Sequence, residues 1–289
     1  MGCSAKHLVI TGTSSGIGKA TMEAALAADY HVFAGDRSIK ANEDADAGGL
    51  LTKIHLDVTN ADDIAAAVST ISTHVGEAGL DGLANIAGIG IPGPIETLPM
   101  ESLHASFDVD VFGQIALTQP LIPLLRKAVG RIVFIGSVGD RVTLPFMGAL
   151  TSAKSAIASL NDTLRLELAP WGIDVVLVEP GIISTGADDK SKVMIDKTLA
   201  DFTPDQKDLY GEAFKRFTDS GYQKQTSGSS PEGVAEVIME ALTVREPRAH
   251  YLTGRKAHRL AFIGALPAKV QDELKRKAFG LRGRGSAKD

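Results

Sequence analysis

A glycine-rich turn follows the first apolar run of the chain. Leu8–Thr11 has the composition of a buried strand, and Gly12, Gly16 and Gly18 come directly after it, where a helical pattern begins. Glycines at such a junction let the backbone approach a pyrophosphate, and the N–H groups at the start of the helix bind the phosphate oxygens. The strand–turn–helix context predicts a dinucleotide-binding site.

The second predicted strand ends in an acid–base pair that bears on the choice of dinucleotide. Asp36 lies about twenty residues beyond the glycines, where a carboxylate accepts hydrogen bonds from the ribose 2′-hydroxyl of NAD. Arg37 follows it and is able to clamp the 2′-phosphate of NADP instead. We therefore favour NAD, with NADP as the alternative.

Short β-branched runs alternate with longer amphipathic stretches along the chain. Several of the runs are apolar throughout, which is typical of parallel strands covered by helices on both faces. The pattern predicts an α/β fold, a single-domain Rossmann-type doubly wound parallel sheet over residues 1–289 with a C-terminal helical extension. The expected strands are Leu8–Thr11, His31–Ala34, Lys53–Leu56, Leu80–Ala84, Arg131–Ile135, Asp174–Val178 and His250–Leu252. The expected helices include Gly18–Ala28, Ile64–His74, Met100–Ala128 and Ser152–Ala169.

The composition bears on the ligands and the cellular location that we expect for this protein. The 289 residues carry a net charge of −5, which does not favour nucleic-acid binding. The one cysteine, Cys3, cannot form an internal disulfide or a thiolate metal site, so we expect no metal and a reducing compartment. No apolar run reaches the length of a membrane helix and no signal peptide is evident, so we expect a cytoplasmic protein.

Two segments depart from the strand–helix alternation. Residues 182–230 are polar and irregular in pattern and too long for an ordinary connection, so we expect a lid over a substrate. Residues 255–289 contain ten Lys or Arg and three acids, with a basic helix predicted at Pro267–Phe279. We interpret this tail as a solvated closing helix rather than a membrane anchor.

The glycine spacing is T-G-x-x-x-G-x-G, and in this the sequence resembles the short-chain dehydrogenase/reductase family. The resemblance extends over nearly the whole chain, through Asp57-Val58, the N-x-A-G segment that begins at Asn85, Ser137, Lys154 and the P-G-x-x-x-T segment that begins at Pro180. It implies the following cofactor-binding residues: Thr11, Gly12, Ser14, Ser15, Gly16, Ile17, Gly18, Asp36, Arg37, Asp57, Val58, Asn85, Ala87, Gly88, Lys154, Pro180, Gly181, Ile183 and Thr185.

The catalytic positions implied by the resemblance are only partly filled. Members of the family use a serine, a lysine, a tyrosine four residues before the lysine, and an asparagine on the preceding long helix. Ser137 and Lys154 match, but Leu150 stands at the tyrosine position and Asp110 at the asparagine position. Leucine has no ionisable proton, and losing a positioned acid–base group usually costs ~10²–10⁴ in rate.

Two hypotheses for function follow from this departure. The first is an NAD(P)-dependent oxidoreductase that acts on a secondary alcohol or ketone through a modified proton relay, with Asp110 paired to Lys154 or acting as an acid. The second is a cofactor-binding pseudoenzyme, a redox sensor or partner protein with little turnover. Tyr210 and Tyr222 in the lid are further candidate proton donors, although lid aromatics are more often packing residues.

The surroundings of the site suggest the class of substrate and the assembly. Leu144, Phe146, Met147 and Leu150 are expected to form an apolar wall, so an apolar alcohol or ketone is the predicted small-molecule substrate. The resemblance also implies a homodimer or homotetramer that packs through the helices at 100–128 and 152–169. We expect neither nucleic acid nor a membrane surface as a partner.

Overall fold

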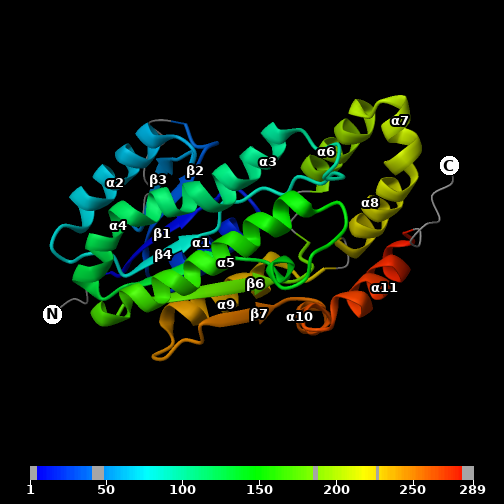
Figure 1. Cartoon of the computed structure of the whole chain (residues 1–289). Helices are drawn as coiled ribbons and strands as arrows, with labels where there is room; N and C mark the ends of the chain where they lie inside the picture. Colours follow the sequence, from blue (N-terminus) through cyan, green and yellow to red (C-terminus); the bar gives the residue numbers. More distant parts are fainter. Residues whose placement is uncertain (1–4, 41–48, 185–187, 226–227, 282–289) are drawn as a thin grey trace.

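The computed structural model describes residues 5–40, 49–184, 188–225 and 228–281, and only the backbone at 188–191 and 222–225. Seven parallel strands form one sheet in the order β3-β2-β1-β4-β5-β6-β7 (Figure 1). The strands are β1 His7–Thr11, β2 His31–Asp36, β3 Leu51–His55, β4 Gly82–Asn85, β5 Arg131–Ile135, β6 Asp174–Pro180 and β7 His250–Thr253.

Helices cover both faces of this sheet. Helices α2 (Ala61–Val75), α4 (Gln114–Ala128) and α5 (Gly148–Leu168) pack on one face. On the other face lie α1 (Gly16–Ala27) and α9 (Pro231–Thr243), which also contact each other. Because both faces are covered, the central strands are apolar throughout, and the predicted doubly wound parallel sheet is confirmed.

The strand order reverses between β1 and β4, and this reversal positions the site. Connections from β1 lead outward to β2 and β3, whereas β4 begins the series that runs the other way to β7. At such a switch point the loops after two adjacent strands diverge and leave a crevice at the carboxyl edge of the sheet. The glycine turn after β1 and the segment after β4 meet at this crevice.

The long helix predicted at 100–128 is interrupted. Helix α3 (Met100–Phe107) is followed by a π-helical turn, Asp108–Gly113, and only then by α4. A π-helical turn inserts an extra residue into the helical ladder and shifts the side chains that follow, and such turns are frequent at functional sites. Here the turn contains Asp110.

The segment after β6 was predicted to be irregular, and that part of the prediction is wrong. It folds as α6 (Asp188–Asp201), the short α7 (Pro204–Gln206) and α8 (Glu212–Gln225), which project beyond the sheet (Figure 1). The segment is polar because α6 and α8 leave much of their surface in solvent, so no apolar periodicity marks these helices. The tail contains α10 (Ala257–Gly264) and α11 (Ala268–Phe279), and α11 packs against α8.

Within the described part of the chain, no helix combines the length and the apolar character needed to cross a bilayer.

Candidate active site

A groove of about 410 Å³ lies at the carboxyl edge of the sheet, over the switch point. Twelve of the residues predicted to bind a cofactor line it: Gly12, Ser14, Ser15, Gly16, Ile17, Gly18, Asp36, Arg37, Asp57, Val58, Ala87 and Gly88. The chain therefore brings together, on one surface, residues from the ends of four different strands.

The start of α1 faces this groove with unoccupied backbone donors. Ser15 occupies the N-cap position but makes no side-chain cap hydrogen bond, and the first turn of α1 contains no acidic residue. A Cβ at Gly18 would lie 2.1 Å from the carbonyl oxygen of Gly12, so only glycine lets the helix approach the end of β1 this closely. The free N–H groups and the helix dipole suit a bound phosphate.

Two of the predicted residues lie under the groove rather than along it. The Thr11 hydroxyl accepts hydrogen bonds from the backbone N–H groups of Ile86 and Ala87, both at 2.9 Å. Asn85 is fully buried, and its side-chain amide donates to the Thr118 hydroxyl at 3.0 Å. Thr11 and Asn85 thus support the loop after β4, which forms one wall of the groove.

The acid at the end of β2 is held as a carboxylate. Asp36 Oδ1 accepts hydrogen bonds from the Ser38 N–H and hydroxyl at 2.9 and 2.7 Å, and Oδ2 accepts from the Ser14 N–H at 3.2 Å. Burial works against ionisation, but these hydrogen bonds outweigh it and hold the pKa of Asp36 below its usual value. Arg37 is exposed beside it.

Asp57 lies two residues after the end of β3, and its carboxylate is also hydrogen-bonded within its own loop. Its Oδ1 accepts from the N–H and the hydroxyl of Thr59 at 2.9 and 2.7 Å. These hydrogen bonds, from the backbone first, lower the pKa of Asp57. The two acids therefore give one end of the groove a negative charge.

A buried ion pair lies against Gly88, which lines the groove, although neither residue of the pair lines the groove itself. Lys154 Nζ is 3.5 Å from Asp110 Oδ1 and donates a hydrogen bond to the carbonyl oxygen of Ile135 at 2.9 Å. Asp110 Oδ1 also accepts from the N–H of Ile89 at 3.0 Å. The lysine is 5% exposed and the aspartate 0%, so the predicted pairing of Asp110 with Lys154 is confirmed.

The electrostatics of this pair are dominated by burial. Burial raises the pKa of Asp110 above its usual value, and the ammonium of Lys154 offsets only part of that effect. The π-helical turn carries Asp110 toward the loop after β4. A Cβ at Gly88 would lie 2.6 Å from Asp110 Oδ1, so a glycine is required there for the pair to form.

Ser137 follows β5 and Leu150 lies on α5, and neither residue lines the groove. The Ser137 hydroxyl accepts a hydrogen bond from the N–H of Gly139 at 3.0 Å, which leaves its own proton for another acceptor. Leu150 is one turn before Lys154, and its Cδ2 lies 3.7 Å from the point that a Cβ on Gly90 would occupy. An apolar side chain thus stands where the family has a phenol.

The other residues predicted to bind a cofactor, as far as the structure describes them, do not line the groove. Pro180 ends β6, and the Gly181 N–H donates to Thr253 O at 2.8 Å. Ile183 lines a second cavity rather than the groove. Thr185, with the side chain of Tyr222, lies outside the described residues.

Tyr210 does not reach the site. Its hydroxyl donates to the carboxylate of Glu96, and this hydrogen bond, together with the local burial and the charge of Glu96, raises the pKa of Tyr210 above its usual value. A phenol with a raised pKa and an acceptor already in place is a poor proton donor to a substrate.

Several groove residues were not predicted: Ser38, Leu56, Ile86, Ile89, Gly90, Val109 and Met194. Ser38 had a signal, since a serine two residues after an aspartate commonly closes a local turn. Met194 had none, because it comes from α6 and reaches the groove only through the tertiary fold. Gly90 also lines the second cavity and joins the two spaces.

The groove fits a dinucleotide in chemical character, with free N–H groups at a helix start, a close-packed glycine turn and a carboxylate at the ribose end. A family model described as short chain dehydrogenase matches residues 6–195. The chain belongs to this family.

Similar proteins extend the match over almost the whole chain. The human dehydrogenase/reductase SDR family member 9 is 33% identical over 93% of this chain and 86% of its own length. The NADPH-dependent 3-dehydrocapnine reductase of Ornithobacterium rhinotracheale is also 33% identical, over 93% and 95%. A short-chain dehydrogenase from Streptomyces avermitilis is 28% identical, with a TM-score of 0.74 and 95% of each chain covered.

A second cluster of charges lies around the buried carboxylate of Glu179 on β6. Glu179, 1% exposed, accepts hydrogen bonds from the guanidinium of Arg141 and lies 3.1 Å from His250 Nδ1. The side chain of Asp140 is 4% exposed. It lines neither the groove nor the second cavity. Burial, and then the neighbouring charge of Glu179, raises the pKa of Asp140 to about 8.

We predict that this cluster makes stability depend on pH. The folded protein keeps a proton on Asp140 up to about pH 8, whereas the unfolded chain releases it near 3.8. The free energy of unfolding therefore falls as the pH rises between these values. Asp140→Asn removes this dependence, so its melting temperature relative to the parent should increase steadily from pH 5 to pH 8.

Differential scanning fluorimetry across that range measures the effect. Asp108→Asn, which neutralises an exposed acid, serves as the control and should follow the parent curve. Parallel curves for Asp140→Asn and the parent would contradict a protonated Asp140.

Proposed function

We propose that this protein is a nicotinamide-dependent oxidoreductase that interconverts a secondary alcohol and a ketone. The observation that carries the proposal is the buried Lys154–Asp110 pair, which lies against Gly88 in the wall of the dinucleotide groove. Enzymes place titratable groups with shifted pKa values beside ligand-binding clefts.

Ser137, Lys154 and Asp110 have different roles in the proposed reaction. A bound nicotinamide supplies or accepts the hydride. Ser137 donates its hydroxyl proton in a hydrogen bond to the substrate oxygen and so positions it. During alcohol oxidation, Lys154 Nζ takes the hydroxyl proton as it passes one of its own to Asp110. The raised pKa of Asp110 favours its role as the proton acceptor.

For the cofactor, the proposal favours NAD over NADP. Asp36 is held as a carboxylate at the ribose end of the groove, and a negative charge there repels a 2′-phosphate. Arg37 supports the alternative because its guanidinium is exposed and able to bind that phosphate. The similar 3-dehydrocapnine reductase is NADPH-dependent by name, which also supports NADP as the alternative cofactor.

The second cavity supports an apolar substrate. Leu144 and Met147 line it, as the predicted apolar wall requires. Phe146 instead packs against Phe214 and Phe217, with ring centroids 5.6 and 5.5 Å apart. Helices α6 and α8 contribute Ile195 and Phe217 to the lining, which supports the proposed role of the segment at 182–230 as a lid.

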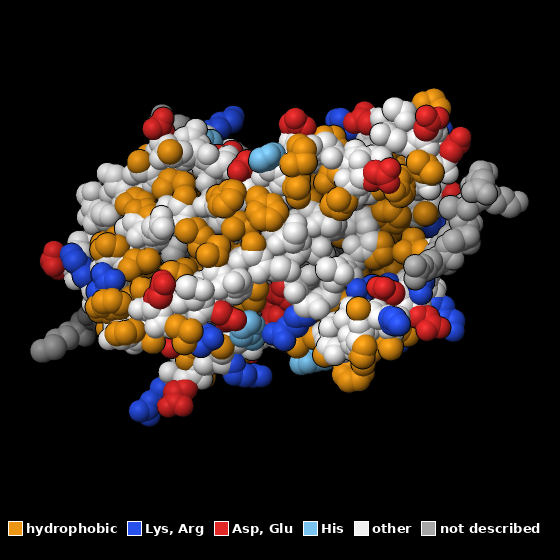
Figure 2. Space-filling view, in the orientation of Figure 1, with side chains coloured by type: hydrophobic (Ala, Val, Ile, Leu, Met, Phe, Trp, Pro, Cys, Tyr) orange, Lys and Arg blue, Asp and Glu red, His pale blue; other side chains and the backbone are white. Residues whose placement is uncertain are grey.

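We also propose that the protein forms a homo-oligomer through the face of α4 and α5. Figure 2 shows hydrophobic side chains grouped over this face. Phe112 is 60% exposed, Leu166 68% and Trp171 48%, and apolar groups in such number are typical of an interface. The cytoplasmic location remains a proposal that rests on the single cysteine of the sequence.

The first prediction concerns turnover. Purified protein with NAD should oxidise members of a panel of apolar secondary alcohols, and Asp110→Asn should lower kcat by about 10²-fold because the proton acceptor is lost. The control, Asp108→Asn, changes an exposed acid in the same turn and should retain the parent kcat. Cofactor binding is followed by fluorescence in the same samples.

Leu150→Tyr, assayed beside them, separates the two hypotheses. A parent that binds cofactor but is silent, together with an active Leu150→Tyr, would identify a dehydrogenase that has lost its chemistry and kept binding. Failure of the parent to bind either dinucleotide would contradict the entire proposal.

The second prediction concerns cofactor choice. Replacing Asp36 with Asn removes the negative charge that faces the ribose, so the ratio of the NADP to the NAD dissociation constant should fall by about tenfold or more. Isothermal titration with both cofactors measures this ratio. Arg37→Gln is the companion variant. If the parent prefers NADP and Arg37→Gln abolishes that preference, Arg37 sets the specificity and our assignment to Asp36 is wrong.

The third prediction concerns assembly. Light scattering should give a mass of two or four times 30.3 kDa. A Phe112→Glu, Leu166→Glu double variant should shift the protein to the monomer, since it buries two charges in the interface. Leu209→Glu, at a site 65% exposed outside this face, should leave the mass unchanged. A parent that is monomeric at micromolar concentration would rule the interface out.

A further inference from the structure

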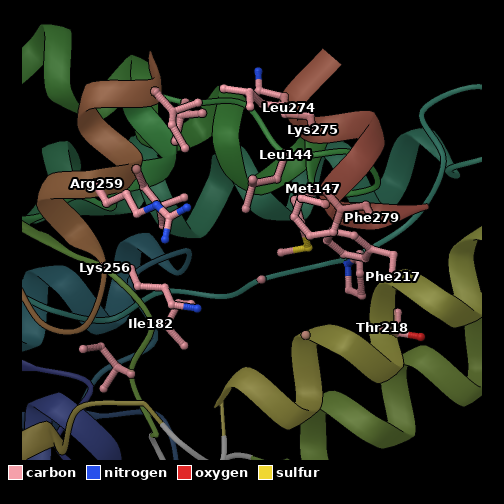
Figure 3. A pocket seen from close by; sticks show the side chains of 18 of the residues that line it. Leu144, Met147, Ile182, Phe217, Thr218, Lys256, Arg259, Leu274, Lys275 and Phe279 are labelled. Atoms are coloured by element: carbon pink, nitrogen blue, oxygen red, sulfur yellow. The ribbon is translucent and has the colours of Figure 1, made fainter. Parts of the chain in front are cut away.

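The second cavity, of about 540 Å³, lies between the sheet edge, the lid and the C-terminal tail. Most of its lining is aliphatic or aromatic, and includes Leu144, Met147, Ile182 and Phe217 (Figure 3). Gly90 is shared with the dinucleotide groove, so the two spaces meet at this residue.

The lining also carries positive charge. Lys256 and Arg259 from the start of α10, and Lys275 from α11, line the cavity, and no Asp or Glu is among the described residues that line it. In Figure 3 the ammonium of Lys256 and the guanidinium of Arg259 extend into the open space. Figure 2 shows blue side chains around α10 and α11, in a molecule whose overall charge is −5.

These charges lack an acidic partner within the described chain. No ion pair joins Lys256 or Arg259 to a described carboxylate, although both are exposed enough to reach one. Lys275 Nζ bonds only to neutral groups, the Thr143 hydroxyl at 3.2 Å and the Gln271 side-chain oxygen at 3.0 Å. The rim of the apolar cavity therefore has a surplus of positive charge.

The backbone places Lys256 at this rim at some cost. Lys256 has a φ of +63°, in the left-handed region that non-glycine residues rarely adopt. Glycine would relieve this strain, yet a long cationic side chain stands at the position, and strained residues of this kind cluster at ligand-binding sites. Lys256 and Arg259 are exposed, so salt should weaken their attraction for an anion.

We infer that the substrate is an amphipathic acid: an apolar body that carries the reacting alcohol or ketone at the Gly90 end and an anionic group held by Lys256 and Arg259. This rests on the proposed function and adds to it the class of substrate. A carboxylate, a sulfonate or a phosphate has the required charge. A neutral alcohol of the same length would leave both cations without a partner.

Binding is tested without turnover, by isothermal titration of the NAD-loaded protein with decanoate, decanesulfonate and 1-decanol below their micelle concentrations. Both anions should bind at least tenfold more tightly than the alcohol, because only they place a charge beside the cations. The difference should decrease with added salt. The comparison of the two anions shows which headgroup is preferred.

The variant pair assigns the effect to these residues. Lys256→Gln with Arg259→Gln should abolish the preference for the anions and leave decanol binding unchanged. Lys269→Gln with Lys277→Gln removes the same charge from exposed positions on α11 that do not line the cavity, and should retain the preference. Equal binding of decanoate and decanol to the parent, or an unaltered preference in the first double variant, would overturn the inference.

A turnover comparison keeps this inference separate from the proposed function. A long-chain hydroxy acid with a secondary hydroxyl should have a higher kcat/KM than its methyl ester. Oxidation of the ester at an equal rate would overturn the inference and leave the proposed function intact. Tight binding of anions with no oxidation of any alcohol would sustain the basic site and count against the proposed function alone.

Discussion

The site depends on one buried hydroxyl. Thr11 ends β1 and accepts hydrogen bonds from two successive N–H groups of the loop after β4, both at 2.9 Å. These bonds join the two loops at the point where the strand order reverses. The glycine turn, the start of α1 and the wall formed by Ala87 and Gly88 are all positioned relative to this connection. The two hydrogen bonds extend the pairing of β1 with β4 into the two loops, which diverge beyond this point.

A second constraint acts where the loop after β4 meets the π-helical turn. The Ile89 N–H and the absence of a side chain at Gly88 let the Asp110 carboxylate approach Lys154 in a space from which water is excluded. A buried pair of this kind is costly to desolvate and gains from its mutual attraction. With leucine at position 150, this pair is the one that we propose exchanges the proton.

The dinucleotide groove and the apolar cavity differ in the charged residues that line them. Asp36 and Asp57 line the dinucleotide groove together with Arg37, whereas Lys256, Arg259 and Lys275 line the apolar cavity. Residues 255–289 carry ten basic and three acidic side chains, a charge of +7, so the remainder of the chain carries −12. Because residues of α10 and α11 line the cavity, part of the positive charge of the tail lies beside it.

The sequence by itself determined the sheet, the glycine turn and most of the groove, because strand burial and backbone approach are local demands that fix residue type. It also identified Asp110 and Lys154 as partners. Only the tertiary structure decided that Asp140 faces Glu179 rather than the substrate, that the segment after β6 is helical, and that Met194 and Lys256 border the two cavities. These depend on contacts between distant parts of the chain, which leave no periodic trace in a polar, solvent-facing segment.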